Sequence, residues 1–117
     1  MDVFEKLDVW KRSARLSVEV YNSLKDSKEY GFKDQLFRSA LSVPSNIAEG
    51  YERGSRKEYI RFLNVAKGSC AELRALLYIG IETEILDRTM ASNHLKEACE
   101  ISKMLQGLIN KLQEVDN

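Results

Sequence analysis

The sequence predicts an all-α protein: a single domain over residues 1–117, folded as an antiparallel up-down-up-down four-helix bundle. Apolar residues recur at steps of three and four almost throughout, which is the period of an amphipathic helix. No stretch alternates apolar and polar residues for long enough to predict a strand. The one proline and six glycines are too few for a loop-rich β protein.

The first helix is predicted to begin between Val3 and Asp8 and to end near Asp26. Asp2 with Glu5 offers a capping box for the earlier start, and Asp8 offers the later start. Residues at three- and four-residue steps lie on one face of a helix, and this apolar face is expected to pack into the core. Its members are Leu7, Trp10, Ala14, Val18, Tyr21 and Leu24.

After a polar turn that ends in glycine, the second helix is predicted over residues Phe32–Arg53. Pro44 lies in its middle, lacks an amide hydrogen and crowds the carbonyl of Ala40. Because the apolar pattern continues in phase across the proline, one helix kinked at Pro44 is favoured over two short helices. Ser42 and Ser45 are candidates to hydrogen-bond the freed carbonyl. The expected core line is Phe32, Leu36, Ala40, Val43, Ile47 and Tyr51.

The third helix is predicted to begin after a capping box formed by Ser55 and Glu58 and to end near Glu82. Its apolar line is Tyr59, Phe62, Leu63, Ala66, Cys70, Leu73, Leu77 and Ile81. Asp87 is predicted to cap the fourth helix. The line of that helix, spaced almost as in a coiled coil, is Ala91, Leu95, Ala98, Ile101, Leu105, Leu108, Leu112 and Val115.

Further apolar residues lie beside these lines and widen the apolar faces. They are Leu16, Val20, Phe37, Leu41, Met104 and Ile109. One interpretation is a broad core stripe, as amphipathic helices often have. The other is a second apolar face used for self-association. The pattern alone leaves both interpretations open.

The charge balance argues against two classes of protein. The sequence has 18 Lys and Arg residues and 18 Asp and Glu residues, and its formal net charge is zero. A nucleic-acid-binding domain usually carries an excess of basic residues, and a membrane anchor a polybasic run. The longest apolar run, residues 75–81, is much shorter than the ~20 residues of a membrane helix. With no signal-peptide pattern at the N-terminus, we expect a cytoplasmic protein.

No catalytic or metal-binding constellation stands out. Cys70 and Cys99 fit no metal-ligand spacing and are expected to be free thiols, although a disulfide between them stays open. His94 is the only histidine and is expected to be exposed or half-buried. Neither a glycine-rich phosphate loop nor a nucleophile elbow is present. We therefore expect no metal, no cofactor and no enzymatic activity.

Polar residues of both charges form a line along the second predicted helix. The simple interpretation is a solvated face with an ion pair between Glu49 and Arg53, worth ~0.3–0.5 kcal/mol. The alternative is a contact surface for a protein or a neighbouring subunit, to which Glu72 would also contribute. The line consists of Arg38, Ser42, Ser45 or Asn46, Glu49 and Arg53.

Basic residues concentrate between the second and third predicted helices, at one end of the bundle. Residues 53–61 contain four basic side chains and one acidic side chain, that of Glu58. A charged helix start is the simpler interpretation, but basic residues in a first helical turn oppose the helix dipole, which favours a partner. Flanking tyrosines offer rings for stacking on unpaired bases. The basic residues are Arg53, Arg56, Lys57 and Arg61, and the tyrosines are Tyr51 and Tyr59.

The string Ser42-Val43-Pro44-Ser45-Asn46-Ile47-Ala48-Glu49-Gly50 is the most distinctive part of the chain. Together with downstream matches it resembles a bacterial family of four-helix-bundle proteins encoded within intervening sequences of large-subunit (23S) ribosomal RNA genes. The similarity takes in most of residues 4–81. Phe37 stands where many relatives carry arginine, and Glu52 where many carry glycine. The motif positions are Ser42, Pro44, Asn46, Glu49, Gly50, Arg53, Gly68, Ser69 and Glu72.

The resemblance implies an antiparallel bundle that assembles into a homo-oligomer, a ring of five subunits. A related branch, the accessory variability determinant of diversity-generating retroelements, is also a pentameric bundle and works with a reverse transcriptase and its RNA. The resemblance thus implies binding of RNA or of an RNA-handling protein. The alternative is a protein-interaction scaffold without nucleic acid. Candidate contact residues are Arg38, Tyr51, Arg53, Arg56, Lys57, Tyr59 and Arg61.

Overall fold

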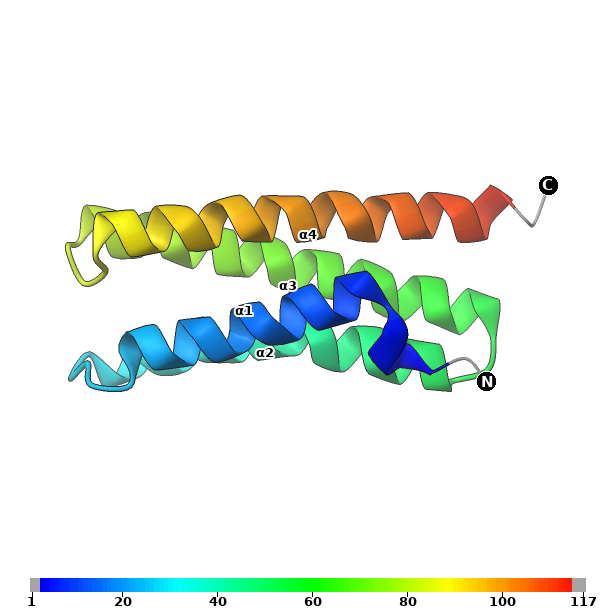
Figure 1. Ribbon diagram of the computed structural model, residues 1–117, viewed down its shortest axis with the longest axis horizontal. Helices are drawn as coiled ribbons and strands as arrows, with labels where there is room; N and C mark the ends of the chain where they lie inside the picture. The colour runs from blue at the N-terminus through cyan, green and yellow to red at the C-terminus, as the bar shows by residue number, and fades with distance from the viewer. Residues whose placement is uncertain (1–2, 115–117) are drawn as a thin grey trace.

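The computed structural model of the protein describes residues 3–114, which form four long α-helices after one short 3-10 turn. Consecutive helices run antiparallel, and the molecule measures 47 × 23 × 20 Å, so its long axis follows the helices (Figure 1). The predicted all-α four-helix bundle is confirmed. The elements are η1 (Phe4–Lys6), α1 (Asp8–Leu24), α2 (Tyr30–Glu52), α3 (Arg56–Glu82) and α4 (Arg88–Glu114).

Two of the predicted caps fix the starts of the long helices. The hydroxyl of Ser55 accepts a hydrogen bond from the amide of Glu58 at 3.3 Å, at the start of α3. The carboxylate of Asp87 accepts one from the amide of Met90 at 2.9 Å, at the start of α4. Each bond pairs one of the amides that a helix leaves open at its N-terminus. The predicted caps at Ser55 and Asp87 are therefore confirmed, whereas the carboxylate of Glu58, predicted to complete a capping box, accepts from Arg61 instead.

The start of α1 follows the later of the two predicted alternatives. Residues Phe4–Lys6 form the separate turn η1, and α1 itself begins at Asp8. Leu7 occupies the N-cap position and supplies no side-chain hydrogen bond. The alternative cap at Asp2 lies outside the described residues, as does Val115 at the end of the apolar line predicted for the fourth helix.

α1 turns a different face to the core than predicted. Of the predicted core line, Val18 and Tyr21 are 59% and 52% exposed, and only Leu24 is buried. The prediction for this face was wrong because α1 carries two apolar lines, and periodicity cannot say which one packs inward. The face that does pack inward has small side chains that admit α2 closely. It consists of Val9, Ser13, Leu16, Ser17, Val20 and Leu24.

The other three core lines are largely buried as predicted. The largest fully buried side chains include Leu36, Ile47, Leu63, Leu77 and Leu105. The ends of the lines, near the rims of the bundle, are half-buried: Phe32, Tyr51, Tyr59, Leu108 and Leu112. Among the residues beside the lines, Leu16, Val20 and Ile109 join the core, Phe37 and Met104 are half-buried, and Leu41 is exposed.

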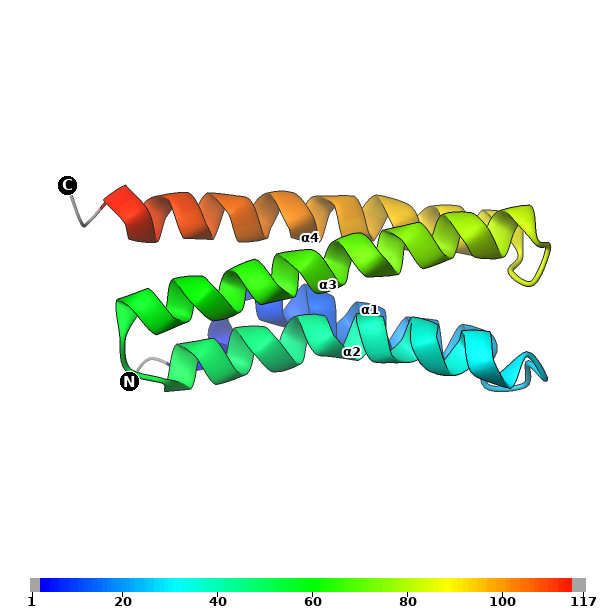
Figure 2. The same cartoon turned by 180° about the vertical axis from the view of Figure 1, so that it is seen from behind.

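α2 continues as one helix across Pro44, which confirms one helix rather than two. The kink at that residue stays a prediction. α2 packs most extensively against α3, whereas α1 and α4 share the least contact of the four neighbouring pairs. Figure 2 shows α2 and α3 side by side, joined at one end of the bundle by the short connection through Gly54.

Candidate functional site

The proline of the motif is accommodated through α1. Because Pro44 has no amide hydrogen, the carbonyl of Ala40 loses its partner within α2. The hydroxyl of Ser17 on α1 lies 2.9 Å from that carbonyl oxygen and also 3.0 Å from the carbonyl oxygen of Ser13. The sequence predicted Ser42 or Ser45 for this role, and that was wrong. Ser45 instead bonds the carbonyl of Leu41 at 2.8 Å within its own helix.

A hydrogen bond between two other motif residues ties α2 to α3, and a third motif residue supports it from within α2. The hydroxyls of Ser42 and Ser69 lie 2.8 Å apart, one on each helix. The side-chain amide of Asn46 donates to the carbonyl of Ser42 at 2.7 Å and approaches its hydroxyl at 3.0 Å. Because these groups are partly buried, each unmade bond would cost stability. The motif thus includes a structural hydrogen-bond cluster between the two helices.

Gly50 marks the closest approach of α2 to α3. A Cβ atom on this residue would lie 2.5 Å from the Cβ of Phe62, which real structures do not tolerate. Only glycine therefore allows the ring of Phe62 to pack directly against the end of α2. Gly68, by contrast, has open space around its missing Cβ, and Glu72 is exposed on the same helix.

The ring of Phe62 also holds two arginines of the predicted basic cluster. The guanidinium carbon of Arg53 from the end of α2 lies 4.9 Å from the ring centroid, and that of Arg61 from α3 lies 4.5 Å from it. Both distances fit a cation–π contact. The fold thereby brings cations from two helices to one aromatic ring at the α2–α3 end of the bundle.

Each of these arginines also forms an exposed ion pair. Arg53 donates to Glu49 at 2.9 Å, and Arg61 donates through two nitrogens to Glu58 at 2.9 and 3.1 Å. The hydrogen bond from Arg61 is the main reason that the pKa of Glu58 lies below its ordinary value. Arg56 and Lys57 are exposed in the first turn of α3. Exposed ion pairs are worth ~0–1 kcal/mol, so an anion can exchange with the carboxylates.

The two tyrosines next to this cluster face each other. Their rings meet edge to face, with centroids 5.6 Å apart, and both residues are half-buried. The hydroxyl of Tyr59 is buried without a hydrogen-bond partner among the described residues, and burial raises the pKa of Tyr59 to about 12. Stacking of a base on Tyr51 or Tyr59 stays a prediction, and the structure limits it to the exposed part of each ring.

Arg38 lies apart from the basic cluster. It is 15 residues before Arg53 on the same helix, which is ~22 Å at the rise of an α-helix. Its guanidinium pairs with Asp34 at 3.2 Å, and both side chains are well exposed. The structure therefore brings Arg53, Arg56, Lys57 and Arg61 together and leaves Arg38 outside.

An apolar groove between α1 and α2 was only partly anticipated. It has a volume of about 610 Å³, and Phe4 of η1 packs edge to face on Trp10 inside it, with centroids 5.2 Å apart. The predicted core line of the first helix forms one wall of the groove. The sequence therefore contained this apolar line, but the prediction placed it in the core. The apolar residues that line it include Phe4, Trp10, Val18, Tyr21, Phe37 and Leu41.

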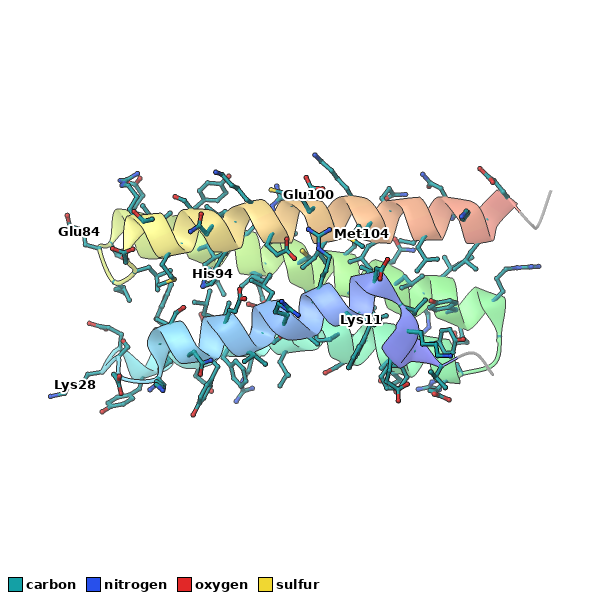
Figure 3. The ribbon with its side chains drawn as sticks, viewed as in Figure 1. Lys11, Lys28, Glu84, His94, Glu100 and Met104 are labelled. Atoms are coloured by element: carbon teal, nitrogen blue, oxygen red, sulfur yellow. The ribbon has the colours of Figure 1, made fainter. Side chains whose placement is uncertain are left out.

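His94 lies at the seam between α1 and α4, where Figure 3 labels it. It is 6% exposed, so the expectation of an exposed or half-buried histidine was wrong. Its Nε2 lies 3.1 Å from the hydroxyl of Ser23, and burial lowers its pKa while nearby Glu19 acts in the opposite direction. The α1–α4 seam is also bridged by Arg12, which donates to Glu97 at 2.6 and 2.9 Å.

Cys70 and Cys99 are both free thiols. Cys70 is buried, its Sγ donates to the carbonyl of Ala98 at 3.1 Å, and burial raises the pKa of its thiol to about 11. Within residues 3–114, no three His, Cys, Asp or Glu side chains are grouped to hold a metal ion. None of the helices described is both long and apolar enough to cross a membrane.

The fold and site define a small helical-bundle protein with a hydrogen-bonded motif between α2 and α3 and a basic cluster at one end. A family model for 23S rRNA-intervening sequence proteins matches residues 5–107, and the chain belongs to that family. A solved structure of a protein of unknown function from the S23 ribosomal protein family of Bacteroides thetaiotaomicron is similar. It is 28% identical with a TM-score of 0.81, and the match covers 86% of this chain and 97% of that one. A search of curated proteins found no match.

Proposed function

We propose that the protein is a non-enzymatic, cytoplasmic homo-oligomer, a ring of five copies, that binds RNA or an RNA-associated protein through the α2–α3 end of the bundle. The observation that carries the RNA proposal is the pair of arginines on Phe62. Arg53 and Arg61 come from different helices, yet their guanidinium groups lie within 5 Å of one ring centroid. Held in this way, both cations lose little side-chain freedom when they meet a phosphate.

Charge distribution supports the same surface. The formal net charge of the chain is zero, so RNA affinity must come from a local concentration of cations. Arg56 and Lys57 add two exposed positive side chains next to the arginines. In a ring of identical subunits the cluster repeats once per copy, so modest affinity per cluster adds up through multivalency.

RNA binding is tested with a fluorescently labelled single-stranded RNA oligonucleotide and fluorescence anisotropy. We expect the affinity to fall steeply between 50 and 200 mM salt. The quadruple variant R53A/R56A/K57A/R61A should abolish binding, and each single Ala variant should reduce the salt slope by ~0.7, the value expected for one phosphate contact on a single strand. Circular dichroism verifies that the variant is folded.

The matched control removes four exposed basic residues away from the cluster: K28A/R88A/K96A/K103A. It changes net charge by the same amount, so binding by overall charge alone would weaken equally in both variants. We expect the control to bind as the parent does. A cluster variant that binds RNA as tightly as the parent contradicts the proposal.

The apolar groove on α1 and α2 favours the alternative function, a protein-interaction scaffold without nucleic acid. In that case the polar line of α2 would contact a protein or a neighbouring subunit. Reversal of charge at Glu49, by E49R, would then change the mass of the assembly in solution. Unchanged mass together with salt-sensitive RNA binding would favour the RNA proposal.

A further inference from the structure

We propose that the groove between α1 and α2 receives α3 of a second copy of this chain, an inference that rests on the proposed homo-oligomer and names its contact surfaces. The groove is open to solvent although its lining is almost wholly apolar. Val18 and Leu41 are 59% and 45% exposed on its two walls. Contiguous apolar surface of this kind on a soluble protein marks an interaction site.

The occupant is identified by a ridge on α3. Val65 and Ile79 are 43% and 51% exposed, and Glu72 lies midway between them. Spacing by seven residues places all three on one line along the helix. Gly68 lies beside this line with open space where its Cβ would be, so nothing within one copy requires a glycine there. The ridge is narrow, exposed and apolar at both ends, as a helix that enters a groove must be.

The charges of the groove and the ridge are complementary. Lys11, Val18 and Lys25 are also seven residues apart and form a line along the outer edge of α1, with Lys11 labelled in Figure 3. Along the α1 line, the apolar Val18 lies between two lysines. Along the α3 ridge, the acidic Glu72 lies between two apolar residues. When the lines are offset by seven residues, Glu72 faces a lysine and Val18 faces an apolar residue of the ridge.

Glu72 has no ion-pair partner among the residues that the structure describes, so its carboxylate is available to a second copy. Lys11 and Lys25 are likewise exposed. A protein with a different sequence would need its own helix with an acidic residue between two apolar ones, whereas every second copy of this chain carries that helix. Charge complementarity therefore favours the second copy over an unrelated protein.

The placement of the two surfaces favours a closed ring. α2 packs against both α1 and α3, and Figure 2 shows α2 and α3 side by side with α1 behind them. The groove belongs to the α1–α2 pair and the ridge to α3, so the two surfaces are carried by neighbouring helices of the bundle. The contact joins two different surfaces and is therefore head to tail. A head-to-tail contact that rotates each copy relative to the one before closes into a ring when it is repeated. A head-to-tail contact without such a rotation would form a filament.

The test uses two variants, each of which destroys one surface. V18E/L41E places charge in the groove, and V65E/I79E places charge on the ridge; all four positions are exposed, so the bundle should still fold. In light scattering without RNA, we expect the parent to be a multiple of the chain mass and each variant to be a monomer. A mixture of the two variants should form a one-to-one dimer and nothing larger, because each partner keeps one intact surface.

A matched control, Y78E/N93E, places the same two charges at exposed positions on α3 and α4 outside both surfaces and should keep the mass of the parent. Charge swap gives an independent check: E72K should weaken assembly, and K11E/K25E in the same chain should restore it. Circular dichroism verifies folding in every case.

Four outcomes would overturn the inference. Variants with the mass of the parent oligomer would place the subunit contact elsewhere and leave the proposed homo-oligomer standing. Loss of assembly in the groove variant alone would indicate a groove-to-groove dimer. A mixture that stays monomeric would show that the two surfaces do not meet. A monomeric parent would overturn both this inference and the proposed assembly, while RNA binding is judged by its own measurement.

Discussion

At the scale of single residues, Pro44 of the motif depends on a hydrogen-bond donor from another helix. Pro44 removes one hydrogen-bond donor from the middle of α2, and the hydroxyl of Ser17 in α1 lies within hydrogen-bond distance of the carbonyl that is left over. A local defect in one helix is therefore repaired by its neighbour. Neither residue shows this when its own helix is considered alone.

We expect Ser17→Ala to lower the free energy of unfolding by about 1–3 kcal/mol, because the carbonyl of Ala40 would be buried without a donor. In a Pro44→Ala background the same substitution should cost much less, since residue 44 then supplies the amide. Urea denaturation of the four proteins measures both costs. Equal costs in the two backgrounds would contradict this account, and Ser45→Ala is the exposed control.

His94 gives the stability a pH dependence. Burial holds its pKa below the ordinary value of 6.5, so the unfolded chain binds the proton more readily than the folded one. The free energy of unfolding should therefore fall as pH drops through 6.5 and level off below the pKa of the folded state. Thermal melts between pH 8 and 5 measure this fall. His94→Gln, which keeps a donor near Ser23, should flatten the curve over that range; a curve like that of the parent would contradict the prediction.

At the scale of helices, the contact between α2 and α3 depends on a missing side chain. Gly50→Ala would place a Cβ against Phe62 and push the helices apart. We expect the free energy of unfolding to fall by about 1–3 kcal/mol, as overpacked cores usually show. Displacement of the Phe62 ring should also weaken its cation–π contacts with Arg53 and Arg61. Gly107→Ala on α4, where the Cβ meets nothing, should instead add about 1 kcal/mol through helix propensity.

Helix by helix, the periodicity of the sequence was enough to predict α2, α3 and α4, including the caps at Ser55 and Asp87. It failed on α1, where Val18 and Tyr21 were assigned to the core but lie in the solvent-exposed groove. Two apolar lines satisfy the helical period equally well there. The choice between them depends on how Ser17 packs against α2, and no pattern within residues 8–24 contains that information.

The candidate site was predictable to a similar degree. Short sequence separation was enough to group Arg53, Arg56, Lys57 and Arg61 at one end of the bundle. It could not show that Phe62 organises two of them, because that contact needs the close approach at Gly50.

At the scale of the whole molecule, self-association should be visible in stability as well as in mass. If copies bind one another only when folded, the melting temperature rises with protein concentration by mass action. We expect such a rise over a hundredfold dilution series of the parent in scanning calorimetry. The groove variant V18E/L41E should melt at a temperature independent of concentration. A parent whose melting temperature does not change on dilution would contradict assembly in this concentration range.

The buried thiol of Cys70 also allows the rate at which the bundle opens to be measured. Its thiol is buried beneath α4, and its pKa near 11 leaves almost no reactive thiolate at neutral pH. A thiol-specific reagent can thus modify it only during the moments when α3 and α4 separate. The slow phase of labelling, timed under native conditions against the half-buried Cys99, reports how often the chain opens, without denaturant and without an introduced cysteine.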